Sequence, residues 1–283
     1  MESKKNTAYL LGHRGARAEW LENSQMGFEY VQTLQNQGLD GVEFDVQMTA
    51  DGEFVVVHDE TLRRLVGEQS WVMDKDLAEL GRFKQSDNAR FQATFDKKFW
   101  GQPILSLQDL LPYLHGYRHI ELEIKTHAKT NPQALVKNLL DLLLNKKLSN
   151  TDWQNLPITL TSFDTDILVE LQNQQQFNAV KFPIGLLLEH NAPLASQIKF
   201  LPLPNPQGKK LINDTFNFAC QLGCVQVGVY YALITPKMVE TAHRFELKVT
   251  AWTVNDIEVA KKLINMGVDC VITDFPTEFL SSF

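Results

Sequence analysis

The sequence predicts an α/β fold, a TIM-type (β/α)₈ barrel with an insertion between the second and third barrel strands. The length of 283 residues suits one such barrel of about 250 residues plus an insertion. Short apolar runs alternate with longer amphipathic segments, which indicates βα units around a parallel sheet. Because the chain shows no internal repeat and no low-complexity run, residues 1–283 are expected to form a single domain.

Eight short apolar runs are predicted as the barrel strands. They are Ala8–Gly12, Gly41–Gln47, His119–Ile124, Ile158–Thr161, Ile184–Leu188, Cys224–Val229, Lys248–Trp252 and Cys270–Thr273. The amphipathic segments predicted as helices are Ser24–Gln37, Ser106–Leu114, Pro132–Leu144, Asp164–Gln174, Pro236–Phe245 and Asn255–Met266. Good N-terminal capping residues precede or open several of them, namely Asn23, Ser106, Asp164, Thr235 and Asn255. Gly267 is a suitable residue to follow the last helix.

Two stretches break this rhythm. The segment 59–103 is too long for a plain strand-to-helix connection, so it is expected to hold short irregular or helical pieces that cover one side of the site. The stretch Lys199–Asn213 is rich in Pro, Gly and Asn and predicts an exposed loop.

Composition excludes several classes of function. With 27 basic and 34 acidic residues the net charge is −7, which argues against a general nucleic-acid partner. No window approaches 18 apolar residues, so no transmembrane segment is expected, and the apolar stretch Ala8–Leu11 is too short for the core of a signal peptide. The three cysteines, Cys220, Cys224 and Cys270, give no disulfide framework and are expected to be structural thiols in a reducing, cytoplasmic setting. The oligomeric state stays open.

Polar side chains gather where the predicted strands end. In a barrel of this type, catalytic groups come from the C-terminal ends of the strands and the loops that follow. The residues at these positions are His13 and Arg14 after the first strand, Glu43 and Asp45 in the second, His58 after the run Phe54–Val57, Glu121, Glu123 and Lys125 at the end of the third, Trp252 in the seventh and Asp274 after the eighth. Residues two apart in a strand share a face, so these acids are expected to point together.

Glu43, Asp45 and Glu123 are candidate metal ligands. If their two strands aim them inward, each like-charge pair at about 4 Å costs about 4 kcal/mol at an effective dielectric near 20. Such a cluster requires protons or a cation, and oxygen ligands alone favour Mg²⁺ or Ca²⁺ over zinc. A hard cation flanked by Arg14 and Lys125 would clamp a phosphoryl group, with the guanidinium as a bidentate donor.

Two histidines are candidates for proton transfer. Imidazole titrates near neutrality, so it can take a proton from a nucleophile or give one to a leaving alkoxide. In-line cleavage of a phosphodiester needs both acts on opposite sides of phosphorus. His13 and His58, which come from different loops, fit that need, although the sequence does not say which is the acid and which the base.

Six linked sequence blocks run along most of the chain. They are Gly12-His13-Arg14-Gly15, Glu22-Asn23-Ser24, Val42–Gln47 with Thr49 and Asp51-Gly52, Val55–Arg63, Leu122–Lys125, and a C-terminal block of Trp252–Asn255, Gly267–Asp269 and Ile272–Pro276. Together and in this order they resemble the glycerophosphodiester phosphodiesterase family of the soluble bacterial type. The resemblance implies a TIM barrel, a divalent metal, and hydrolysis to an alcohol and sn-glycerol 3-phosphate.

Carried over position by position, the resemblance assigns roles to single residues. His13 and His58 match the acid and base, and Glu43, Asp45 and Glu123 match the metal ligands. Arg14 and Lys125 match residues on the phosphate side, and segment 59–103 occupies the place of the family's insertion. Trp252 is expected either to pack in the core or to line the glycerol pocket. Asp274 is expected to hold the eighth loop or to orient Arg14.

The sequence departs from the family pattern at four places. Glu121 stands where the family often has Asn; it is expected either to support a metal ligand or form an ion pair, or to ligate the metal itself. Arg64-Leu65-Val66 replaces a stretch rich in Thr and Gly, which puts the substrate preference in doubt. Cys270 replaces a common Gly, and Phe245-Glu246 replaces a usual Gly.

Two other functions compete with glycerophosphodiester hydrolysis. A lysophospholipase D or phospholipase C-like enzyme on a similar barrel would need an apolar lip. The aromatic residues of the insertion could form either a lid or a small core; they are Trp71, Phe83, Phe91, Phe95, Phe99 and Trp100. A non-enzymatic barrel that binds phosphorylated ligands is disfavoured because every candidate catalytic position is filled. The other histidines are expected to be structural or on the surface; they are His115, His119, His127, His190 and His243.

Overall fold

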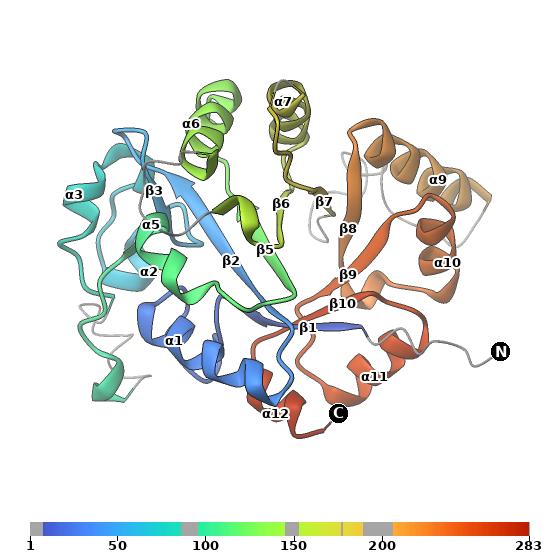
Figure 1. Ribbon diagram of the computed structural model, residues 1–283, viewed down its shortest axis with the longest axis horizontal. Helices are drawn as coiled ribbons and strands as arrows, with labels where there is room; N and C mark the ends of the chain where they lie inside the picture. Colours follow the sequence, from blue (N-terminus) through green and yellow to red (C-terminus); the bar gives the residue numbers. More distant parts are fainter. Residues whose placement is uncertain (1–7, 86–95, 145–152, 177, 189–205, 283) are drawn as a thin grey trace.

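Eight parallel strands close into a barrel surrounded by helices (Figure 1). The computed structural model describes residues 8–85, 96–144, 153–176, 178–188 and 206–282. The barrel strands are β1 (Tyr9–His13), β2 (Gly41–Met48), β5 (His119–Ile124), β6 (Ile158–Ser162), β7 (Ile184–Leu188), β8 (Cys224–Tyr230), β9 (Lys248–Trp252) and β10 (Cys270–Thr273). Strand β1 pairs in parallel with both β10 and β2, which closes the ring. The predicted fold class is confirmed, and each predicted strand lies within one residue of the observed bounds.

Alternation along the strands divides the core from the interior of the barrel. In β2, Phe44 points outward, and its ring lies edge-on to that of Phe28 from helix α1 (Gln25–Leu34), with 6.0 Å between the ring centroids. Glu43 and Asp45, one residue to either side, point into the barrel. Because apolar side chains fill the space between strands and helices, the main hydrophobic core is the layer outside the barrel.

Helices of the outer layer connect most of the strands. They are α1 (Gln25–Leu34), α6 (Pro132–Leu144), α7 (Thr165–Gln175), α9 (Pro206–Gln221), α10 (Pro236–Arg244), α11 (Ile257–Asn265) and α12 (Pro276–Leu280). Two capping predictions were wrong by one residue: Ser24 rather than Asn23 caps α1, and Asp256 rather than Asn255 caps α11. Ser106, Asp164 and Thr235 act as caps, as expected.

The predicted loop Lys199–Asn213 is wrong over its second half. Residues 199–205 lie outside the described part of the chain, but helix α9 begins at Pro206 and runs through Asn213 to Gln221. Proline fits the first turn of a helix because its fixed φ is helical and its missing N–H would have no partner there. The composition of this stretch therefore marks a helix start rather than a continuous loop.

A small layer extends β2 beyond the barrel. After a turn at Gly52, β3 (Phe54–Val56) pairs antiparallel with β2, and β4 (Leu105–Ser106) pairs with β3. Between them lie α2 (Arg63–Val66) and α3 (Leu77–Leu80), and α5 (Leu107–Leu110) follows. Buried residues of this segment form a second apolar cluster, Val55, Val57, Leu62, Leu65, Val66, Val72, Leu80 and Ile104. This layer fixes the loop that carries His58.

No helix in the described residues is both long and apolar enough to cross a bilayer.

Candidate active site

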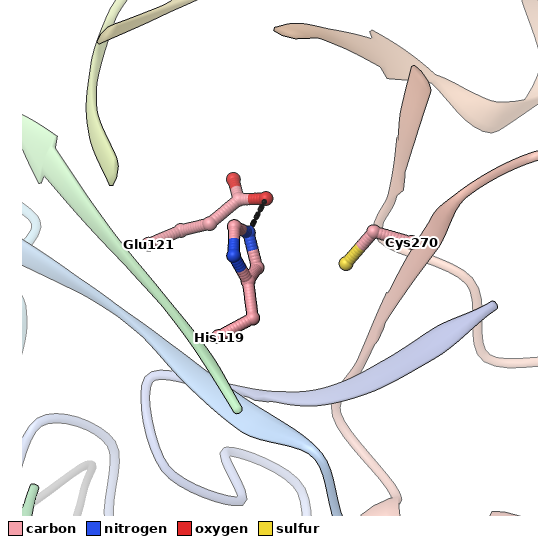
Figure 2. Close-up of side chains that lie close together, drawn as sticks. All are labelled: His119, Glu121 and Cys270. Carbon is pink, nitrogen blue, oxygen red and sulfur yellow. Dashed lines mark hydrogen bonds and ion pairs between the residues drawn. The ribbon is translucent and has the colours of Figure 1, made fainter. Parts of the chain in front are cut away.

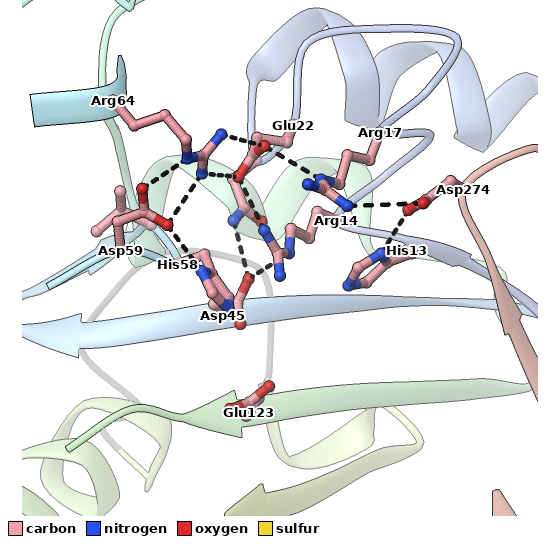
Figure 3. A network of polar contacts seen from close by, with 12 residues as sticks. His13, Arg14, Arg17, Glu22, Asp45, His58, Asp59, Arg64, Glu123 and Asp274 are labelled. Carbon is pink, nitrogen blue, oxygen red and sulfur yellow. Dashed lines mark hydrogen bonds and ion pairs between the residues drawn. The ribbon is translucent and has the colours of Figure 1, made fainter. Parts of the chain in front are cut away.

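A cavity of about 210 Å³ opens at the C-terminal ends of the barrel strands. Seven of the eight predicted site residues line it, namely His13, Arg14, Glu43, His58, Glu123, Lys125 and Trp252. The eighth, Asp45, is fully buried beside them. The structure thus brings together side chains that the sequence spreads over 240 positions, from His13 to Trp252. Figure 3 shows the polar contacts of His13, Arg14, Asp45 and His58.

The turn after β1 places His13 and Arg14. A Cβ at Gly12 would lie 2.1 Å from the carbonyl oxygen of Gly15, so only glycine permits this close return of the chain. Arg14 adopts the left-handed conformation at φ 49°, and its backbone N–H donates to Glu43 Oε2 at 3.2 Å. The turn therefore ties the first loop directly to a candidate metal ligand on the neighbouring strand.

Glu43, Asp45 and Glu123 converge as the alternation of the strands predicts. One oxygen of each lies within 4.8 Å of the others. Burial raises the pKa of Glu43 well above its usual value, and the neighbouring charges of Asp45 and Glu123 raise it further. Burial opposes ionisation of Asp45 too, but the charges of Arg14 and Lys125 outweigh it and hold its pKa well below the usual range. The surrounding charges therefore favour the ionised form of Asp45, whereas burial and like charges favour the protonated form of Glu43, and a further cation would oppose that shift.

The donor set fits a hard divalent cation. Among the described residues, Asp45 Oδ1 accepts no hydrogen bond, although it is fully buried, and its contact with Lys125 Nζ at 3.3 Å is an ion pair. An unsatisfied carboxylate oxygen beside two further carboxylates suits Mg²⁺ or Ca²⁺, which prefer oxygen ligands. Glu43, Asp45 and Glu123 would hold such an ion.

Both predicted phosphate-side cations are engaged by these acids. Arg14 Nε lies 3.1 Å from Asp45 Oδ2, and its Nη1 donates to Glu22 Oε1 at 3.0 Å. Lys125 Nζ donates to Glu123 Oε1 at 2.6 Å. Because both still line the cavity, they place positive charge at its wall, and an anion that enters would compete for them.

A carboxylate orients His13. Its Nδ1 lies 2.5 Å from Asp274 Oδ1, and Asn255 Nδ2 donates to the other oxygen of Asp274 at 2.8 Å. Burial opposes ionisation of Asp274, but the hydrogen bond from His13 overcomes it, so the pKa of Asp274 is lowered. An ionised carboxylate accepts, so Nδ1 carries the hydrogen and Nε2 is left to face the cavity. Burial lowers the pKa of His13, which favours a neutral imidazole. Asp274 thus contacts His13 rather than Arg14, whose orientation had been one expectation for it.

The side-chain amide of one buried residue, Gln47, holds the loop that carries His58. Gln47 Nε2 lies within hydrogen-bonding distance of three successive carbonyl oxygens, those of Val57 at 3.1 Å, His58 at 3.2 Å and Asp59 at 2.7 Å. The side chain of His58 in turn meets Asp59 Oδ1 through Nδ1 at 2.8 Å. This arrangement repeats at His58 the pairing of imidazole and carboxylate seen at His13.

Sequence reasoning missed a set of arginines around Glu22 (Figure 3). Arg64 donates to both oxygens of Glu22, at 2.8 and 2.7 Å, and to Asp59 through Nε at 2.6 Å. Arg17 donates to Glu22 at 3.3 Å and lines the cavity. The signal was present in part: Arg64 lies in the stretch that departs from the family pattern, and Arg17 lies four residues after His13, in the loop that follows β1.

Aromatic rings form part of the cavity wall, and Lys125 Nζ lies 5.9 Å from the ring centroid of Phe163. Trp252 meets Phe163 edge-on at 5.6 Å and Tyr230 at 5.8 Å. The peptide bond from Trp252 to Thr253 is cis, and both residues line the cavity. Trp252 is thus packed by its neighbours and also lines the cavity, and its contact with the glycerol moiety stays a prediction.

Fold and site together define an enzyme of the (β/α)₈-barrel class with an acidic cluster beside two imidazoles. The pattern of the Glycerophosphoryl diester phosphodiesterase family matches residues 13–278. The chain therefore belongs to this family, whose members are phosphoric diester hydrolases that generally depend on a divalent metal.

Comparison with individual proteins agrees with this assignment. The chain is 24% identical over 276 residues, 96% of each chain, to a glycerophosphodiester phosphodiesterase of Caldanaerobacter subterraneus. It is 25% identical over 300 residues, all of this chain and 90% of the relative, to a lysophospholipase D of Mus musculus. Its fold resembles that of an Oleispira antarctica phosphodiesterase in complex with the product sn-glycerol-3-phosphate, with a TM-score of 0.73 and 20% identity over 98% of this chain and 96% of that one.

Proposed function

We propose that the protein hydrolyses glycerophosphodiesters to an alcohol and sn-glycerol 3-phosphate, with Mg²⁺ or Ca²⁺ held by Glu43, Asp45 and Glu123. The observation that carries the proposal is the convergence of these acids with His13 and His58 at one cavity. Membership of the family supports it, as does the product described for the Oleispira antarctica phosphodiesterase. A bound divalent cation would polarise the phosphoryl group and offset charge that develops in the transition state.

Three basic side chains would hold the phosphate. Arg14 and Lys125 stand at the cavity wall with their ion-pair partners beside them, so they are already oriented when the diester enters. Arg17 is the most open of the three, with 41% of its side chain exposed and contacts of 3.3 Å to Glu22 and 3.6 Å to Asp274. We assign it a direct contact with a non-bridging oxygen.

The two imidazoles would divide the proton transfers. His13 is buried, favours the neutral form and presents Nε2, so it suits removal of a proton from the nucleophile, a water or an adjacent substrate hydroxyl. His58 is more open, with 34% of its side chain exposed, and suits protonation of the leaving alcohol and exchange of that proton with water. Asp274 and Asp59 act as positioning residues that fix each ring.

Turnover of soluble diesters tests the proposal. Purified protein is incubated with glycerophosphocholine or glycerophosphoethanolamine, and sn-glycerol 3-phosphate is identified in the product. The expected result is release of this product, its loss with a chelator and its return with Mg²⁺ or Ca²⁺. Binding of metal and diester without turnover would instead establish a non-enzymatic binding protein.

A lysophospholipase D is the second candidate, favoured by the likeness to the Mus musculus relative. The structure describes part of the aromatic set that could serve a lipid. Trp71 is 41% exposed, whereas Phe83 packs against the small apolar cluster of the insertion. Phe91 and Phe95 lie outside the described residues. Comparing rates on lysolipid micelles with rates on soluble diesters separates the two activities.

Two broader assignments belong to the same proposal. Segment 59–103 is proposed as an insertion within one catalytic domain, because its first residues, Asp59 and Arg64, contact His58 and Glu22 at the site. A cytoplasmic location is proposed from the thiols: Cys220, Cys224 and Cys270 are all free.

A further inference from the structure

A second cluster of potential ligands lies at the opposite end of the barrel interior (Figure 2). His119 opens β5, Glu121 follows two residues later on the same face, and Cys270 opens β10. One ligand atom of each lies within 4.8 Å of the others. Since β5 and β10 are separated in the ring by β2 and β1, the cluster spans the interior rather than joining paired strands.

The cluster is buried but has room beside it. Exposed fractions are 9% for His119, 1% for Glu121 and 3% for Cys270. A cavity of about 400 Å³ at this end of the barrel is lined by His119 and Cys270 and by the polar residues Gln226 and Thr250. Space next to buried polar groups allows a small ion, and a water molecule with it, to enter.

The surroundings supply groups that support a ligand. Thr250 Oγ1 donates to Glu121 Oε1 at 2.9 Å, which fixes the carboxylate. Gln226 is 1% exposed and lines the same cavity, and its Nε2 has no hydrogen-bond partner among the described residues. A buried amide donor of this kind has a partner if an ion-bound water occupies the cavity.

We propose that His119, Glu121 and Cys270 form a binding site for a thiophilic divalent cation, Zn²⁺ by preference. One imidazole, one carboxylate and one thiolate are the three ligand types that zinc accepts, whereas Mg²⁺ and Ca²⁺ avoid sulfur. The thiolate and the carboxylate together neutralise the charge of the ion. The fourth position is left to water in the adjoining cavity.

Zinc coordination requires only small movements of these three side chains. Zinc bonds of about 2.0–2.3 Å in tetrahedral geometry bring ligand atoms to roughly 3.3–3.8 Å from one another. His119 Nε2 already lies 3.1 Å from Glu121 Oε1, and the ion replaces this hydrogen bond with two coordinate bonds. Cys270 Sγ closes the remaining gap by a side-chain rotation. The alternative is a histidine–glutamate hydrogen bond with a bystander thiol, which has no affinity for metal.

The site would be structural. It joins β5 to β10 across the barrel near the N-terminal ends of these strands, where residues of a TIM barrel generally serve stability, although Glu121 also lines the active-site cavity and pairs in register with Glu43. An ion that binds the folded state but not the unfolded one raises the melting temperature by mass action. The protein is therefore expected to melt at a higher temperature with Zn²⁺ than after chelation.

Cobalt provides a direct test, because Co²⁺ replaces Zn²⁺ and reports thiolate ligation by a charge-transfer band in the near ultraviolet. Metal-free protein is titrated with CoCl₂ and then with ZnCl₂. We expect one cobalt ion per chain to give a thiolate band, besides any cobalt at the active site, and we expect zinc to displace that ion. The band should persist in a Glu43→Gln/Asp45→Asn variant, because the oxygen ligands of the active site give none.

Matched variants locate the thiolate. Cys270→Ser is expected to abolish the band and weaken zinc binding at least about 100-fold, and Thr250→Val to weaken it about 10–100-fold as a supporting partner. The control Cys220→Ser/Cys224→Ser removes both other thiols and should keep the band and the affinity. Absence of a thiolate band in the unmodified protein, or its survival in Cys270→Ser, overturns the proposal. Neither result bears on hydrolysis of phosphodiesters.

Discussion

The two ends of the barrel interior carry clusters built by the same alternation of side chains but with different chemistry. At the C-terminal end, three carboxylates lie with Arg14, Lys125 and two imidazoles around an open cavity. At the N-terminal end, one carboxylate lies with an imidazole and a thiol in a buried position. The first set suits a hard cation and an anionic substrate, and the second a soft cation alone.

The difference lies in what neutralises the charge. Arg14 and Lys125 both contact Asp45 in the cluster at the C-terminal end, and they are the side chains proposed to bind phosphate. The described hydrogen bonds of Glu121 come from a neutral hydroxyl and an imidazole. Strand position alone therefore does not define an active site in this barrel; the cations around the acids do.

The strongest test of the comparison removes the imidazoles of the catalytic end. His13→Ala and His58→Ala are each expected to lower kcat by about 10²–10⁴-fold, the range for loss of a general acid or base. The fold and divalent-metal binding should persist, because neither ring is a proposed ligand. Steady-state kinetics and circular dichroism measure both. The exposed His115 provides the control, His115→Ala, and near-normal turnover in either test variant would remove that histidine from the mechanism.

A milder change displaces one imidazole without removing it. Gln47→Leu deletes the amide that holds the loop of His58 and is expected to lower kcat by about 10–100-fold, since displacements near 1 Å cost up to about 100-fold. KM should change less, because the phosphate contacts remain. Gln175→Leu is the matched control: Gln175 is also buried and bonds the backbone of Phe182, far from the cavity. An equal loss of kcat in both variants would indicate general destabilisation instead.

The sequence predicted the residues that meet at the C-terminal end of the barrel better than those at the other end, for a physical reason. Alternation in β2 and β5 required Glu43, Asp45 and Glu123 to share the interior, and the structure brings them within 4.8 Å. The order of strands in a (β/α)₈ barrel then brings the first and second loops together, which places His13 and His58 at one cavity.

What the sequence could not supply were contacts that depend on side-chain reach. Arg64 meets Glu22 across 42 positions, and no spacing rule encodes that pair. His119 and Cys270 had each been expected to be a structural residue, because alone neither signals a ligand; only closure of the barrel brings them together. The start of α9 at Pro206 was likewise hidden, since Pro and Gly mark loops and helix starts alike.

Stability in acid should depend on Glu22, the carboxylate that the arginines beside the active site surround. Burial opposes its ionisation, but hydrogen bonds from Arg64 and the charge of Arg14 lower its pKa to about 2. A depressed pKa adds stability that is complete above the unfolded value and is lost as the pH falls toward 2. The shift from 4.5 to about 2 corresponds to about 3 kcal/mol.

Urea unfolding between pH 2 and 7 measures this contribution. Glu22→Gln is expected to lower the free energy of unfolding at pH 7 and to flatten its fall between pH 4.5 and 2. Glu278→Gln, which changes an exposed carboxylate, should leave the acid branch as it is. Parallel acid branches in Glu22→Gln and the unmodified protein would show that the arginines do not stabilise this carboxylate.

The smallest expected effect lies at the N-terminal end of β9, where only stability should respond. Glu246 adopts the left-handed conformation at φ 59°, which costs an L-residue about 1–2 kcal/mol. Glycine avoids this cost, but its greater conformational freedom in the unfolded state lowers the free energy of unfolding by about 0.5–1 kcal/mol. Glu246→Gly is therefore expected to raise the free energy of unfolding by up to about 1 kcal/mol and the melting temperature by about 2 °C, with kcat unchanged. In Glu240→Gly the same substitution falls inside α10 and should destabilise by about 1 kcal/mol. If both variants melted at a lower temperature, the left-handed residue would contribute contacts that outweigh its backbone cost.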